Sequence, residues 1–167
     1  MILGIDPGKK GAGVFLNEQG DYLSHFLMPM NKNELDYNEL SHYINTFDTE
    51  NTIVYLEGLT MPFPGSKGSK GTYLIQGQTW GIIRGLLYGM EIRTKVIHPK
   101  TWTSQTHKGQ PKGIAPKDKS YRVFTQELCL DPKKMFGEKA KSKIEGLIDA
   151  YLIAMYGLKR ERNEEIR

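Results

Sequence analysis

The first third of the chain alternates short apolar runs with turn residues. Residues 2–7 and 11–17 are apolar runs, and the sequence Asp6-Pro7-Gly8 opens the turn between them. Residues 21–30 alternate loosely between apolar and polar side chains. Runs of this length, bounded by proline and glycine, are typical of strands joined by tight turns. The pattern therefore predicts three consecutive strands that begin with a hairpin.

Helical spacing follows the third run. Leu35, Leu40, Tyr43, Ile44 and Phe47 recur at intervals that predict a helix. The rest of the pattern predicts a strand over 52–56, a loop rich in proline and glycine over 62–71, a helix over 72–88, a strand over 91–97, a loop over 108–116, a helix from Lys117 and a helix over 142–159.

These elements are enough for one core. The chain has 167 residues, of which 38% are hydrophobic and 25% are charged, and this length is close to that of one ordinary domain. The order βββαβαβαα predicts a mixed α/β fold, in which an antiparallel meander is extended by strands that return through helices. We expect a single domain over residues 1–160 and a frayed polar tail over 161–167.

Basic residues are concentrated in one third of the chain. Residues 92–143 carry thirteen lysines and arginines and four acidic residues, whereas residues 1–91 carry six basic and ten acidic residues. A clustered basic block favours a surface that binds a polyanion such as nucleic acid. On composition alone, a solvated lysine-rich loop is an equally good interpretation.

Composition also excludes several classes of protein. No apolar run approaches the roughly 20 residues needed to cross a bilayer, and Asp6 lies where a signal peptide needs an apolar stretch. The single Cys129 can form neither an intramolecular disulfide nor a cysteine-based zinc site. We therefore expect no membrane insertion, no classical secretion and a reducing, cytoplasmic location.

Four carboxylates stand at positions suited to chemistry. Asp6 and Glu57 each end an apolar strand, and Glu145 and Asp149 lie four residues apart on one face of the last helix. Carboxylates gathered in one place repel one another unless a divalent cation lies between them, and Mg²⁺ or Mn²⁺ suits such oxygen ligands. Two such ions can promote the hydrolysis of a phosphodiester. Taken singly, however, Asp6 could be ordinary turn chemistry, and the helix pair could be a solvated stripe.

At this point the sequence resembles the RuvC family of Holliday junction resolvases, particularly its compact phage-type members. The matching segments are Gly4-Ile5-Asp6-Pro7-Gly8, Val54-Tyr55-Leu56-Glu57, the glycine-lysine loop over 65–71, Gly77 to Gly89, Val96 to Trp102, Lys117-Asp118-Lys119 and Glu145 to Ala154. Their order extends the likeness over residues 1 to about 158. The resemblance implies a ribonuclease H-like fold with a mixed five-stranded sheet and helices on both faces.

The same resemblance implies a homodimer that nicks four-way DNA junctions at symmetric positions. It implies divalent-metal dependence, with Mg²⁺ or substituting Mn²⁺, two ions per active site, and no nucleotide cofactor. Asp6, Glu57, Glu145 and Asp149 occupy the four acidic catalytic and metal-binding positions of the family pattern. The sequence departs from that pattern at the helix pair, because Glu145 stands where Asp is usual and Ile144 where His is common.

The candidate DNA contacts come from the loop after Glu57 and from the basic block. They are Lys67, Lys70, Lys100, Lys117, Lys119 and Arg122. Lys117 and Lys119 are the favoured phosphate contacts, because they open a helix directly after the basic loop. His98 and His107 are both expected at exposed loop positions. The predicted dimer interface is the helix over 72–88, although a role in the core is equally consistent with its apolar residues. The expected site of action is the cytoplasm of a bacterial cell or of a phage-infected host.

Three other functions compete with this hypothesis. A nuclease of the same fold could prefer forks or flaps. The Gly-Ile-Asp-x-Gly start also opens a phosphate-binding hairpin in sugar kinases and actin-like ATPases, but those enzymes need about twice this length and a second hairpin. A junction-binding protein without catalytic activity is the last alternative. Its four retained carboxylates argue against it, and the departures at Ile144 and Glu145 argue for it.

Overall fold

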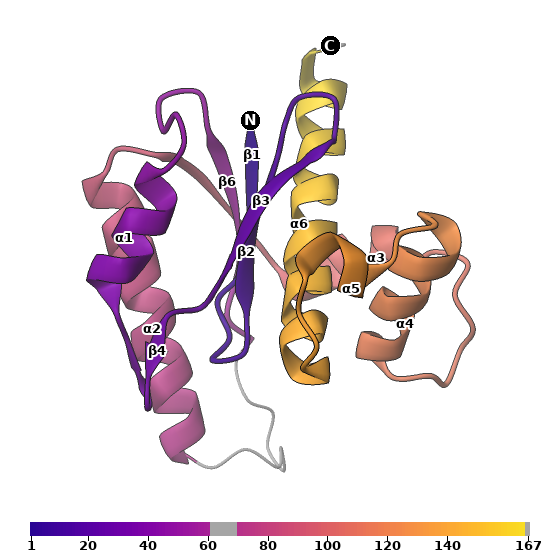
Figure 1. Cartoon of the computed structure of the whole chain (residues 1–167), viewed down its shortest axis with the longest axis horizontal. Helices are drawn as coiled ribbons and strands as arrows, with labels where there is room; N and C mark the ends of the chain where they lie inside the picture. Colours follow the sequence, from indigo (N-terminus) through magenta and orange to yellow (C-terminus); the bar gives the residue numbers. More distant parts are fainter. Residues whose placement is uncertain (61–69, 166–167) are drawn as a thin grey trace.

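A five-stranded sheet forms the centre of the molecule. The computed structural model describes residues 1–60 and 70–165. The strands lie in the order β3-β2-β1-β6-β7 (Figure 1). β2 is antiparallel to β1 and β3, whereas β6 is parallel to β1 and β7. The strands are β1 (Ile2–Asp6), β2 (Ala12–Leu16), β3 (Tyr22–Leu27), β6 (Ile53–Glu57) and β7 (Arg93–Ile97).

Helices cover both faces of this sheet, as Figure 1 shows. One face carries α1 (Tyr37–Asn45) and α2 (Lys70–Gly89), beside a small hairpin of β4 (Met30–Asn31) and β5 (Glu34–Leu35). The other face carries α3 (Pro99–Thr106), α4 (Pro116–Arg122), the π-helical turn η1 (Val123–Glu127), α5 (Pro132–Phe136) and α6 (Lys141–Glu165). The predicted mixed α/β fold with a five-stranded sheet and helices on both faces is confirmed.

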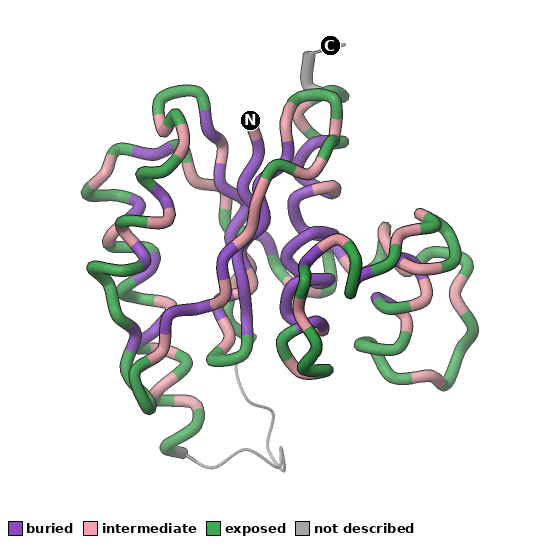
Figure 2. Tube along the Cα trace, viewed as in Figure 1, coloured by how far each residue is buried: buried purple, intermediate pink, exposed green. Residues whose placement is uncertain are grey.

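Each face has its own hydrophobic cluster, because successive strand side chains point to opposite sides. Leu3, Ile5 and Phe15 pack with buried residues of α1 and α2. Ile2 and Val14 pack with α6, η1 and α5. Figure 2 shows the strands and α6 as the most continuously buried segments, with exposed residues along the outer sides of α1 and α2.

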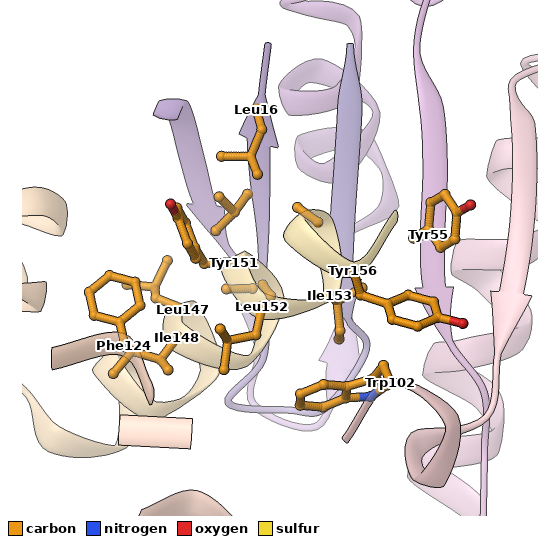
Figure 3. Close-up of a cluster of buried hydrophobic side chains, with 14 of the residues drawn as sticks. Leu16, Tyr55, Trp102, Phe124, Leu147, Ile148, Tyr151, Leu152, Ile153 and Tyr156 are labelled. Carbon is orange, nitrogen blue, oxygen red and sulfur yellow. The ribbon is translucent and has the colours of Figure 1, made fainter. Parts of the chain in front are cut away.

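α6 lies unusually close to β1, and glycines make this possible. A Cβ built on Gly4 would lie 2.3 Å from the carbonyl oxygen of Ala150 and 2.4 Å from the amide nitrogen of Ala154. A Cβ on Gly146 would lie 2.1 Å from the carbonyl oxygen of Lys10. Figure 3 shows the large side chains of α6, such as Leu152 and Ile153, filling the space between the helix and the strands. The close approach fixes which residues of α6 can reach the end of β1.

Two helices of this face were not predicted. Pro99 was expected to stop a strand, but it also occupies the first turn of α3, and the ring of His98 accepts a hydrogen bond from the Lys100 amide at 3.2 Å. Trp102 is the only buried residue of α3, so no apolar stripe marks the helix in the sequence. α5 spans only five residues after its Asp131 cap. The spacing of apolar residues therefore predicts neither helix.

The prediction of a frayed polar tail from residue 161 is wrong, because α6 continues through Glu165. The Tyr55 hydroxyl donates a hydrogen bond to Glu161 at 2.6 Å, and the Lys95 ammonium lies 2.8 Å from the same carboxylate. Arg162 donates to the carbonyl oxygen of Glu18 at 2.6 Å. Polar contacts with the sheet and its loops hold these last turns, and such contacts leave no hydrophobic pattern in the sequence.

Candidate active site

Strand alternation brings two carboxylates to the face that α6 covers. Ile2 in β1 and Tyr55 in β6 belong to the cluster under α6. Asp6 and Glu57 follow them at even spacing, so they point to the same face. The last paired positions of these parallel strands are Ile5 and Leu56, and Asp6 and Glu57 come directly after them. The two acids therefore end neighbouring strands at the same edge of the sheet.

α6 supplies the third carboxylate. Asp149 precedes Ala150, whose carbonyl oxygen lies against Gly4 of β1. The Asp149 residue is buried, with 8% of its surface exposed. Its Oδ1 atom is buried and has no hydrogen-bond partner within the described part of the chain. A buried carboxylate oxygen without a partner is costly, so this atom is poised to take a ligand.

Lys117, in the first turn of α4, lies among these acids. Its Nζ donates a short hydrogen bond to Asp149 Oδ2 and lies 4.0 Å from Asp6 Oδ2. The Lys117 side chain is 48% exposed, whereas that of Asp6 is 13% exposed. The ammonium thus connects the buried carboxylates with the solvent. The structure brings this predicted phosphate contact directly to the predicted metal site.

Burial and the nearby charges shift the pKa values of Glu57, Asp6 and Lys117. Burial raises the pKa of Glu57 to about 7, and the charge of Asp6 adds to this effect. Burial also raises the pKa of Asp6, although Lys117 opposes the shift. Burial lowers the pKa of Lys117, but the carboxylates of Asp149, Asp6 and Glu57 together outweigh it and leave that pKa raised. These couplings show that Asp6, Glu57, Asp149 and Lys117 form one electrostatic unit.

Two tryptophans hold Glu57 in place. The indole N–H of Trp102 donates to Glu57 Oε1 at 2.8 Å, and that of Trp80 donates to the Glu57 backbone oxygen at 3.0 Å. Trp102 is 3% exposed and packs beneath α6, as Figure 3 shows. This role of Trp102 was not predicted from the sequence. The available signal is the chemistry of tryptophan itself, because a buried indole N–H needs an acceptor.

Glu145 is more exposed than Asp6 and Asp149, whose side chains are 13% and 11% exposed. Its side chain is 29% exposed, and its Oε1 is 3.8 Å from Lys141 Nζ. The neighbouring Gly146 packs on the turn between β1 and β2, beyond the end of β1. A spacing of four residues keeps Glu145 and Asp149 on one helix face but separates them by about 6 Å along the axis. The expectation that all four acids meet stays a prediction.

A hard divalent cation suits the donors at this site. Asp6, Glu57 and Asp149 are electrostatically coupled, Asp149 Oδ1 has no hydrogen-bond partner among the described residues, and the acids repel one another. Within residues 1–60 and 70–165, no group of three His, Cys, Asp or Glu side chains is close enough to form a metal-binding cluster. Lys117 provides the positive charge instead. The residues fit Mg²⁺ or Mn²⁺ in donor type and in charge, and two of them are paired with Lys117 here.

His107 is not the exposed loop histidine that was expected. It is half-buried, its Nε2 lies 3.0 Å from the Ser120 hydroxyl, and its ring packs edge-on against Trp102 at 5.8 Å between centroids. Burial lowers the pKa of His107, although the charge of Asp149 opposes the shift. His107 therefore braces α3 against α4 behind the carboxylates. His98 is exposed, as expected, and caps α3.

The other predicted DNA contacts take different positions. Lys100 and Lys119 line one open groove between α3 and α4, together with Thr103 and Ser104. Arg122 is half-buried, and its Nε has no hydrogen-bond partner among the described residues. Lys67 and the side chain of Lys70 lie outside the described part of the chain. The structure thus places Lys100 of α3 and Lys119 of α4 at the same groove.

The sequence itself matches no protein-family model, and it matches no curated protein. No helix in the described part of the chain is long and apolar enough to cross a membrane.

Solved structures show where this fold occurs. Thermus thermophilus RuvC in complex with a Holliday junction substrate superposes with a TM-score of 0.60 and 12% sequence identity, over 96% of this chain and 95% of that protein. A second structure of Thermus thermophilus RuvC gives a TM-score of 0.59 and 14% identity, over 97% of this chain and 96% of that protein. The chain therefore has a ribonuclease H-like fold of the RuvC type.

Proposed function

We propose that this protein is a structure-selective endonuclease that resolves four-way DNA junctions by metal-dependent hydrolysis of phosphodiester bonds. The observation that carries the proposal is the electrostatic coupling of Asp6, Glu57 and Asp149 with Lys117, which contacts Asp6 and Asp149. The fold supports it, because it is shared with a RuvC that was solved with a junction. Such an enzyme would act on DNA in the cytoplasm of a bacterial cell or a phage-infected host.

Asp6, Glu57 and Asp149 would hold the metal, with Glu145, one turn nearer the start of α6, as a further candidate. The proposed site holds two ions, either Mg²⁺ or Mn²⁺. When bound there, they would supply an activated water and neutralise charge on the phosphodiester. Trp102 keeps one oxygen of Glu57 in a fixed place. A carboxylate that is already held in place does not have to be reoriented during the reaction, and the hydrogen bond from Trp102 would aid catalysis in this way.

Lys117 has a second task in this proposal. Its ammonium lies at the boundary between the buried acids and the solvent, where a DNA phosphate would approach. A bound cation would relieve the carboxylates of their need for Lys117, so the lysine could turn to the phosphate. Lys100 and Lys119 would extend the contact along the groove between α3 and α4. Such contacts provide affinity that depends on salt and not on base sequence.

The proposed enzyme is a homodimer, because symmetric nicking of a junction needs two sites related by a two-fold axis. The outer face of α2 is the proposed interface. Gly77, Gly81, Gly85 and Gly89 recur every four residues, and a Cβ on any of them would meet nothing within 4 Å. Leu74 and Tyr88 on the same helix are 63% and 85% exposed. Exposed glycines weaken a helix by about 1 kcal/mol each relative to alanine, so close approach of a second helix would explain them.

The decisive experiment is cleavage of a labelled four-way junction in Mg²⁺, in Mn²⁺ and in EDTA, with a fork and a linear duplex as controls. We expect paired symmetric nicks from the wild type only with a metal. Asp6→Asn and Glu57→Gln should each lower the rate by about 10³-fold or more and leave junction binding intact, because both lose charge at the reacting centre. Glu50→Gln changes an exposed glutamate outside the site and should cut like the wild type.

Other outcomes would contradict the proposal in distinct ways. Junction binding without cleavage in any metal would make the chain a binding protein. Faster cleavage of the fork than of the four-way junction would make it a fork nuclease with the same chemistry. Unchanged cleavage by Asp6→Asn would show that the carboxylates are not catalytic.

A further inference from the structure

A second concave site opens beside the carboxylates. A pocket of about 450 Å³ lies between α4, α5 and the start of α6. Its walls include Lys117, Tyr121, Lys133, Lys139, Lys141 and Glu145. We call it the lysine pocket. Its volume lies within the range of small-molecule binding sites, so it can admit one nucleotide but not a duplex.

The lysine pocket is strongly positive. Four of its lining residues are lysines and two are acidic. Lys117 is paired with Asp149, and Lys141 lies 3.8 Å from Glu145 with its side chain 86% exposed. Among the described residues, neither Lys133 nor Lys139 forms an ion pair through its ammonium. Lysines that converge on one hollow repel one another, and an anion would relieve that repulsion.

Tyr121 gives this pocket an aromatic wall. It is 45% exposed, although it lies on α4 between the buried Ser120 and Arg122, whose Nε is also buried. An exposed aromatic ring beside basic groups provides a stacking surface for an unpaired base, and such stacking is worth about 1–3 kcal/mol per base. A base inside a duplex is already stacked on its neighbours, so the ring favours an unpaired nucleotide.

Lys117 connects the pocket with the carboxylates, because it lines the pocket and also contacts Asp149 and Asp6. Glu145 also lines the pocket. A DNA strand that places a phosphate at Lys117 would therefore bring an adjacent nucleotide to the lysine pocket.

We propose that the lysine pocket binds one unpaired nucleotide of the DNA strand next to the cleaved phosphate. Lys133 and Lys139 hold its phosphate, and Tyr121 stacks on its base. This inference rests on the proposed nuclease function, and it adds a specific expectation about the substrate. The enzyme selects branched DNA partly because a branch point can release a nucleotide into this pocket, whereas an intact duplex cannot.

The test uses 2-aminopurine, whose fluorescence falls when it stacks. The probe is placed next to the cut position in a four-way junction and, separately, within a single-stranded oligonucleotide, and the full-length protein is added in EDTA. We expect the wild type to quench both probes. Tyr121→Phe should keep the quenching because the ring remains, and Tyr121→Ala should lose it. Tyr37→Ala, which changes a tyrosine of α1 that is 58% exposed, should have no effect.

The lysines are tested through the salt dependence of binding. The double variant Lys133→Ala/Lys139→Ala should weaken binding of both DNAs about tenfold and lower the salt slope by roughly 0.7 to 0.9, because the contact with one phosphate is lost. Lys134→Ala is the matched control. Lys134 is an exposed neighbour on α5 that does not line the pocket, so its loss should change affinity less than twofold.

The outcomes separate this inference from the proposed function. If the wild type cuts junctions but Tyr121→Ala and the double lysine variant behave like their controls, the pocket assignment is wrong and the nuclease stands. If the wild type never cuts a junction, yet single-stranded quenching depends on Tyr121 and the two lysines, the pocket stands and the nuclease proposal fails. Absence of quenching with either DNA overturns the pocket assignment.

Discussion

The two faces of the central sheet use the same strands for different purposes. Under α1 and α2, the sheet contributes apolar side chains such as Leu3, Ile5 and Leu56. Under α6, the same strands end in Asp6 and Glu57, which meet the buried Asp149. Alternation along each strand separates these two sets without any change of backbone path. Both faces carry a hydrophobic cluster that stabilises the fold, so the α6 face can tolerate charges that repel one another at the ends of its strands.

Glycine shows the same contrast between the faces. Gly4 lies where α6 touches β1, and no Cβ fits there. Gly81 lies on the outer side of α2, where a Cβ would meet nothing within 4 Å. Packing within the chain requires glycine at position 4, whereas no contact within the described part of the chain requires glycine at position 81. Replacing each of them by alanine is therefore a direct test of the difference.

Gly4→Ala should have the largest effect on stability. The new methyl group would lie 2.3 Å from a backbone oxygen of α6, so the helix must move or the strand must distort. We expect a loss of about 3 kcal/mol in the free energy of unfolding, measured by urea denaturation. A loss of less than about 1 kcal/mol would mean that α6 is free to shift on the sheet.

Glu57→Gln should change how stability depends on pH in the absence of divalent metal. The pKa of Glu57 is about 7 in the folded protein, above its ordinary value of 4.5. Its raised pKa stabilises the folded state below pH 4.5, and this contribution is lost as the pH rises through 7. Relative to the wild type, the variant should therefore gain about 2 kcal/mol between pH 5 and pH 8. Denaturation at both values checks this. Parallel curves for the two proteins would show that Glu57 is not buried among charges.

Trp102→Phe tests the support for Glu57. Phenylalanine keeps an aromatic ring in the core but removes the N–H that bonds Oε1. We expect kcat for junction cleavage to fall about tenfold, which is the effect of one lost hydrogen bond to a charged group, and junction KM to stay unchanged. Trp80→Phe, which loses only a bond to the backbone oxygen, should have a smaller effect. Equal losses in the two variants, or a rise in KM alone, would point to general disturbance of the fold.

Gly81→Ala should have the smallest effect and the opposite sign. An alanine in this exposed helical position should stabilise the monomer by about 0.5–1 kcal/mol, because glycine is a poor helix former. It should also weaken the proposed dimer, as measured by sedimentation. A stabilised chain with an unchanged dimer would place the interface elsewhere than on α2.

The sequence predicted the strands well and the helices of the basic block poorly. Apolar runs and turn residues revealed each strand of the five-stranded sheet, because those strands bury alternating or continuous apolar side chains. The sequence did not predict α3 and α5, because each is short and buries few residues. It did not predict the last turns of α6, because Glu161 and Arg162 hold them through polar contacts.

The sequence likewise predicted some features of the candidate site and not others. The spacing of Asp6 and Glu57 at strand ends predicted their shared location, and the structure brings them together with Asp149. The position of Glu145 was not predictable from its spacing, because its distance from Asp6 depends on where α6 crosses β1. The contacts of Lys117 and Trp102 join segments far apart in the chain, and no local pattern encodes them.

What the sequence determined by itself was therefore the direction of side chains: which face of a strand or helix each residue occupies, since this follows from backbone periods of 2 and 3.6 residues. What only the tertiary structure decided was proximity. The close packing of α6 on Gly4 set Asp149 beside the strand ends and left Glu145 at the lysine pocket. The placement of α4 brought Lys117 into the gap. The packing of the whole core sets the distances between elements, so the sequence of a single segment does not predict them.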